Sequence, residues 1–154
     1  MTLRSRLSTT PAPTTFGRVF ATLAVHVVLG PLIGTAFALL VLVPLAVVAL
    51  GPAAIRAIGS ILAAAPWLPY SYGLLPAALV GIVVVLRERM IGGSVPWRQT
   101  AAIGLLVGLV AGLFSFGRFP ATNPYLVGLF AVSGLAAALG CRLVLALLRR
   151  WTRI

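Results

Sequence analysis

Four long apolar stretches, separated by short connections, set the strongest constraint on how this chain can fold. Each approaches or exceeds the roughly 20 residues that a helix needs to cross the hydrocarbon core of a bilayer. The composition agrees, since the chain is 61% hydrophobic and 8% charged, with a mean hydropathy of +1.14. A soluble domain has about 25% charged residues, which this chain cannot supply. The sequence therefore predicts an all-α, polytopic membrane protein.

The basic residues alternate between the two sides of these stretches, and all twelve of them are arginine. Nine lie before the first stretch, between the second and third, or after the fourth (Arg4, Arg6, Arg18; Arg87, Arg89, Arg98; Arg149, Arg150, Arg153). The opposite connections carry one each, Arg56 and Arg118. Because cytoplasmic loops are enriched in basic residues, both termini are predicted to be cytoplasmic. The use of arginine without lysine, with abundant glycine, alanine and proline, indicates a bacterial inner-membrane protein.

The expected organisation is a single four-helix transmembrane domain that follows a short tail. We expect the membrane spans at about residues 18–43, 70–86, 100–117 and 124–148, within a domain of residues 17–154. Residues 1–16 are rich in Thr and Pro and have little apolar surface to bury, so we expect a disordered cytoplasmic tail.

The segment between the first and second spans is apolar but broken by glycine and proline. Over residues 51–69 these are Gly51, Pro52, Gly59, Pro66 and Pro69. We expect an interfacial or re-entrant helix near 53–65 on the outer face. The rival interpretation is a further span over about 44–65, which would put Arg56 near the bilayer centre at a cost of about 2.5–3.5 kcal/mol.

Small residues recur at every fourth position in all four stretches. This spacing places them on one face of a helix, and in lipid such faces let helix backbones approach closely. We expect helix packing at Gly30, Gly34, Gly73, Gly81, Gly104, Gly108 and Gly112. These faces could meet within one bundle or form a seam with another chain, and the sequence leaves both open.

Two residues are candidates for a polar site inside the membrane, His26 and Arg142. Intramembrane ionisable groups often mark functional sites. His26 could relay a proton, bind a metal or haem, or form a hydrogen bond to a neighbouring helix, whereas Arg142 could reach the headgroups or face inward toward an anion. The chain has one His and one Cys, Cys141, so no second ligand accompanies His26 and we expect no metal and no cofactor. Glu88, the one acidic residue, is expected to pair locally with Arg87 and Arg89.

The net charge of +11 points to lipid rather than to nucleic acid, because the arginines flank membrane spans. Anionic headgroups attract juxtamembrane arginine by about 1 kcal/mol each, and we expect such contacts at Arg87, Arg89, Arg149 and Arg150. Other membrane-protein subunits, or further copies of the chain, are the remaining expected partners.

The absence of a carboxylate pair, a nucleophile–base set or a phosphate loop predicts a protein that is not an enzyme. The leading hypothesis is a small accessory, assembly or regulatory subunit of a larger inner-membrane complex. The alternative is a small oligomeric transporter or channel for an anionic or apolar solute, with His26 and Arg142 as its polar groups.

Overall fold

The computed structural model describes residues 16–116 and 124–152, and within these ranges the chain forms five α-helices and no strand. In chain order they are α1 (Phe16–Leu50), α2 (Ala53–Ala64), α3 (Leu68–Ile91), α4 (Trp97–Phe116) and α5 (Pro124–Thr152). The prediction of an all-α protein is confirmed. The predicted tail, apart from Phe16, lies outside the described residues.

Three of the described helices are long and apolar enough to cross a membrane, namely Phe16–Leu50, Trp97–Ser115 and Pro124–Arg150. A chain with several such helices belongs in a bilayer, because each would otherwise expose a long apolar surface to water. The helix α3 is not one of the three; it has 24 residues and carries Arg87, Glu88 and Arg89 near its end.

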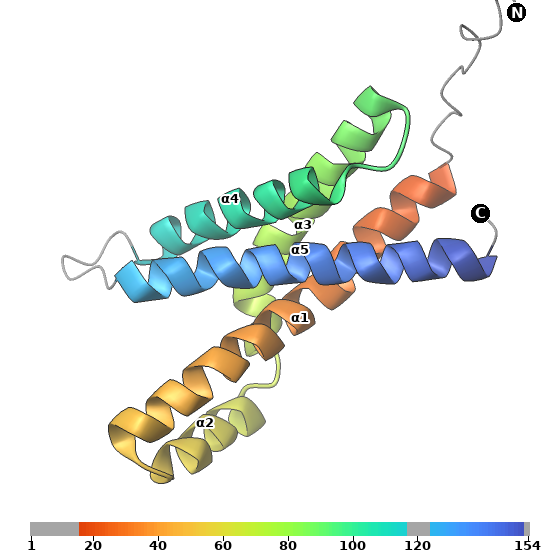
Figure 1. Ribbon diagram of the computed structural model, residues 1–154. Helices are drawn as coiled ribbons and strands as arrows, with labels where there is room; N and C mark the ends of the chain where they lie inside the picture. Colours follow the sequence, from red (N-terminus) through yellow and green to blue (C-terminus); the bar gives the residue numbers. More distant parts are fainter. Residues whose placement is uncertain (1–15, 117–123, 153–154) are drawn as a thin grey trace, which may run out of the picture.

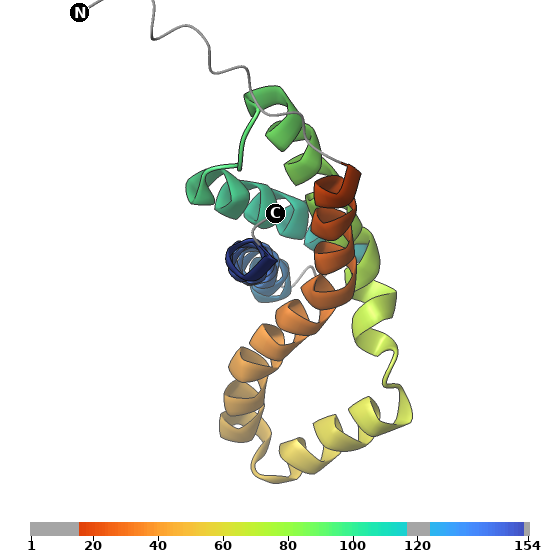
Figure 2. The same cartoon turned by 90° about the vertical axis from the view of Figure 1, so that its right-hand side faces the viewer.

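The first helix is longer than the predicted span. It continues through Pro31 and Pro44 to Leu50, so its 35 residues extend for about 52 Å, against about 30 Å for a hydrocarbon core. Figure 2 shows that α1 bends along its length, as helices that contain proline commonly do. The helix ends at Gly51, whose φ of +78° is a left-handed conformation that glycine adopts without steric cost.

A short helix folds back at this turn. The helix α2 has 12 residues, about 18 Å in length, and packs beside the end of α1 (Figure 1). It is too short to cross a bilayer, and the break at Gly51 falls inside residues 44–65. The rival single span over those residues is therefore not formed, and the expected helix near 53–65 is present as α2.

The four long helices form two antiparallel pairs that cross each other (Figures 1 and 2). One pair is α1 with α3, and the other is α4 with α5. The pairs join where α1 contacts α5 and where α3 contacts α4, so the helices close into a ring. As a result, the helix ends that carry most of the arginines lie together at one end of the bundle. They are the first turns of α1 and α4 and the last turns of α3 and α5.

Glycines occupy the closest helix contacts. A Cβ atom built on Gly104 would come within 2.6 Å of the Gly134 carbonyl oxygen, and one on Gly108 within 2.5 Å of the Phe130 carbonyl oxygen. On the other pair, a Cβ on Gly73 would lie 3.0 Å from Pro31. The backbones approach this closely because no side chain separates them, which is how small residues stabilise helix pairs in lipid.

Candidate functional site

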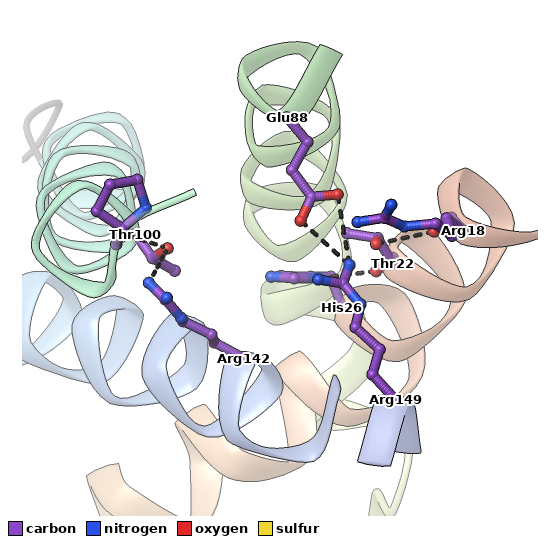
Figure 3. Close-up of polar contacts among 8 residues, drawn as sticks. Arg18, Thr22, His26, Glu88, Thr100, Arg142 and Arg149 are labelled. Atoms are coloured by element: carbon purple, nitrogen blue, oxygen red, sulfur yellow. Dashed lines mark hydrogen bonds and ion pairs between the residues drawn. The ribbon is translucent and has the colours of Figure 1, made fainter. Parts of the chain in front are cut away.

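A charged cluster lies at the arginine-rich end of the bundle and joins three helices. Glu88 of α3 is 5% exposed and accepts hydrogen bonds from the Arg149 guanidinium of α5, at 3.1 Å for the shorter N–O distance. Figure 3 shows this ion pair above His26, with Arg18 and Thr22 of α1 beside it. The predicted local pairing of Glu88 with Arg87 and Arg89 is wrong, because the helix turns Glu88 toward the bundle interior.

The α1 side of this cluster adds a second cation. Thr22 donates a hydrogen bond to the Arg18 carbonyl oxygen at 2.9 Å and is fully buried. The Arg18 Nε atom is buried and has no hydrogen-bond partner among the described residues. Glu88 forms its ion pair with Arg149, and Arg18 beside that pair adds a second positive charge, so this end of the bundle has an excess of positive charge.

His26 lies just inside the charged cluster and is 2% exposed. Its Nδ1 atom is 2.8 Å from the Thr22 carbonyl oxygen, one helical turn earlier. Gly81 of α3 provides room for the ring, since a Cβ built there would come within 3.1 Å of the His26 Cβ. The other ring nitrogen, Nε2, is buried and makes no hydrogen bond to any described residue.

Arg142 belongs to a different site. Its guanidinium donates to the Thr100 hydroxyl oxygen at 3.3 Å, and that hydroxyl in turn donates to the Pro96 carbonyl oxygen at 3.3 Å. Figure 3 shows Arg142 directed at Thr100 of α4, away from His26. The two predicted polar residues are therefore not brought together, and Arg142 links α5 to the start of α4.

Two of the four arginines expected at the headgroups make contacts within the protein. Arg149 binds Glu88, and Arg87 donates from Nε to the Gln99 side-chain oxygen at 3.2 Å. Arg89 and Arg150 are exposed. Sequence reasoning missed the interhelical roles because the partners lie on other helices, 12 and 61 residues away along the chain.

An apolar cavity of about 360 Å³ lies between the helices, on the side of His26 away from the arginine-rich end. All five described helices contribute to its wall, α2 through Leu62 alone. Most of the wall is glycine, alanine, valine or leucine, including Gly34 of α1 and Ala137 of α5. The cavity follows from this composition, because helices lined with small residues touch where they cross and leave space where they diverge.

Two residues of the wall carry a buried polar atom without a hydrogen-bond partner. The atoms are His26 Nε2 and the Ser133 hydroxyl oxygen, both buried and both unpaired within the described part of the chain. Ser133 could bond its own helix backbone, yet it does not. Cys141 also belongs to the wall, fully buried, with its thiol 3.7 Å from the Val25 carbonyl oxygen. Over the described residues no three His, Cys, Asp or Glu side chains come close enough to hold a metal.

Comparisons of the chain with protein-family models, with curated proteins and with solved structures found no match.

Proposed function

We propose that the protein is a multi-pass inner-membrane protein that binds a small, largely apolar molecule in the cavity between its helices. The cavity carries this proposal. Small-molecule sites are typically concave, mostly apolar, at least about 300 Å³ in volume and provided with a few polar groups. The cavity of about 360 Å³, with His26 and Ser133 in its wall, has these properties.

The unpaired polar atoms give the second support. A buried donor or acceptor without a partner costs about 1–3 kcal/mol, and native proteins contain few of them. Two occur here on residues that line one cavity. A bound molecule that forms a hydrogen bond with either atom would recover part of that cost.

The proposed topology has four spans, with both termini in the cytoplasm and α3 as the fourth span. Its support is the gathering of arginine at one end of the bundle, where Arg149, Arg87 and Arg142 join α5, α3 and α4. Arg56 lies on α2, at the far end of α1. With 24 residues, about 36 Å, α3 has the length of a span, and we propose that Arg89 and Arg150 contact anionic headgroups.

These observations change the order of the two functional hypotheses. Small-residue faces packed against another chain would support the accessory-subunit hypothesis, but Gly104, Gly108 and Gly134 face one another inside the bundle. A cavity with His26 in its wall instead favours handling of an apolar solute. Arg142 lies outside the cavity wall, so an anionic solute has less support than an apolar one.

A cavity-filling substitution tests the proposal. A Cβ on Gly34 would meet only ordinary contacts, the nearest at 3.7 Å, so Gly34→Leu should fold and extend its side chain into the cavity. Gly59→Leu is the matched control, because Gly59 is on α2 with nothing within 4 Å of its Cβ position and does not line the cavity.

The measurement is mass spectrometry of apolar molecules extracted from each protein after purification from native membranes in mild detergent. We expect at least one species that the wild type and Gly59→Leu retain and that Gly34→Leu loses. Identical extracts from all three proteins would contradict binding in the cavity.

The topology has its own test, by labelling single cysteines in a Cys141→Ala background with a membrane-impermeant maleimide. Ser60→Cys, on exposed α2, should react in intact cells. Met90→Cys, which is 77% exposed at the arginine-rich end, should react only after the cells are opened. The reverse pattern would overturn the proposed orientation.

A further inference from the structure

The hydrogen bond of His26 identifies which of its ring nitrogens carries a proton. Nδ1 is 2.8 Å from the Thr22 carbonyl oxygen. A carbonyl oxygen can only accept a hydrogen bond, so Nδ1 must donate and must therefore be protonated. In a neutral imidazole the other nitrogen, Nε2, then has a lone pair and can only accept.

The surrounding charges favour the neutral ring. The neighbouring cluster already contains Arg18 and Arg149, and Glu88 is the chain's single acidic side chain. An imidazolium would add a third positive charge to a region with one negative charge, in a site that is 2% exposed. Burying an uncompensated charge is unfavourable, so the ring stays neutral and Nε2 remains an acceptor.

The position of Nε2 gives this acceptor a use. The atom is buried and has no partner among the described residues, and His26 forms part of the cavity wall. Ser133, which carries the second unpaired polar group, lies level with Gly34, since a Cβ built on Gly34 would be 3.7 Å from the Ser133 carbonyl oxygen. Gly34 is eight residues or about 12 Å along α1 from His26. A single small polar group in the cavity cannot bind both atoms, so each forms a separate polar point in an apolar site.

We propose that the molecule bound in the cavity is an apolar alcohol or phenol whose hydroxyl donates a hydrogen bond to Nε2 of His26. This inference rests on the proposed function and specifies its ligand class. Ligands without a donor, such as hydrocarbons and ethers, fill the same space but leave Nε2 unpaired. The site therefore distinguishes molecules by a donated proton as well as by size.

The single histidine of the chain makes a direct test possible. In protein labelled with ¹⁵N-histidine, all ring nitrogen signals come from His26. Before any probe is added, we expect Nδ1 at the protonated and Nε2 at the deprotonated chemical shift. Addition of 4-tert-butylphenol should move the Nε2 signal upfield, as a hydrogen bond to that nitrogen requires. The isosteric 4-tert-butyltoluene, which has no donor, should leave it in place.

Affinity provides the second measurement, with both probes titrated into the protein in nanodiscs. A hydrogen bond to Nε2 should make the phenol bind about tenfold more tightly than the toluene in the wild type. This preference should disappear in His26→Phe and persist in Gly59→Leu. If His26→Phe does not fold, the wild-type nitrogen spectra still test the proposal.

The outcomes separate this inference from the proposed function. Equal binding of the two probes to the wild type, with binding of both lost in Gly34→Leu, would overturn the role of His26 and leave the cavity site intact. A deprotonated Nδ1 in the absence of probe would also overturn the inference. Failure of both probes to bind the wild type would overturn the site and the inference together.

Discussion

The α4–α5 contact is the closest in the bundle, and a single added methyl group should destabilise it. In Gly108→Ala the new Cβ would lie 2.5 Å from the Phe130 carbonyl oxygen and 3.1 Å from the Ala131 Cα. Both neighbours are backbone atoms, so no side chain can rotate away. Ordinary contact begins at 3.4 Å, and the two helices must therefore separate by about 0.9 Å at this point.

The size of the effect follows from that separation. A gap of 0.5–1 Å loses about a quarter to a half of the dispersion energy of the atoms that face it, and overpacking of this kind costs about 1–3 kcal/mol. Alanine is the better helix former by up to about 1 kcal/mol, which offsets part of the loss. We expect Gly108→Ala to lower the free energy of unfolding by about 1–2 kcal/mol.

The assay is unfolding by sodium dodecyl sulfate in mixed micelles, followed by the fluorescence of the three tryptophans. The matched control is Gly128→Ala, also a glycine-to-alanine change in a long helix, where a Cβ would have nothing within 4 Å. This control should equal or exceed the wild type in stability. If Gly108→Ala is as stable as Gly128→Ala, the close α4–α5 contact does not exist in the membrane protein.

Three further substitutions can be measured by the same assay. Glu88→Gln leaves Arg149 without its carboxylate partner and should cost about 1.5–3 kcal/mol, whereas the exposed Arg150→Gln should cost less than about 0.5 kcal/mol; equal effects would contradict a buried ion pair. Thr100→Val removes the acceptor of Arg142 with little change of shape and should cost about 1 kcal/mol. If the two side chains interact, this loss should vanish in an Arg142→Leu background. Gly51→Ala places a Cβ at a φ of +78° and should cost about 1 kcal/mol. The control Gly59→Ala, within helix α2, should not destabilise the protein. If Gly51→Ala does not change the stability, that result would argue against the turn between α1 and α2.

Much of the architecture could be predicted because it depends on local properties of the chain. A run of apolar residues of sufficient length forms a helix in lipid, since every backbone group then bonds within its own segment. The fourth predicted span begins at residue 124, where α5 begins, and the expected helix near 53–65 is α2. The predicted first span stops at residue 43, whereas α1 continues through Pro44 to Leu50, because a proline inside a helix can be accommodated by a bend.

The candidate site could be predicted only in part. His26 and Arg142 stand out in the sequence as polar residues in apolar stretches, but nothing there indicates that one lines a cavity and the other binds Thr100. Ser133 does not stand out in the sequence, because a serine in a membrane helix usually bonds its own backbone. The unpaired hydroxyl became visible only from the tertiary structure.

The sequence by itself determined that the chain is helical, that it belongs in a membrane and where its arginine lies along the chain. Hydrophobic length and the positions of basic residues are sufficient for these properties, because they depend on single segments and their solvent. Only the tertiary structure decided that Glu88 pairs with Arg149, that Gly108 touches α5 and that a cavity opens beside His26. These features depend on how each helix is rotated and where it crosses its neighbours, which the packing of all the helices decides together.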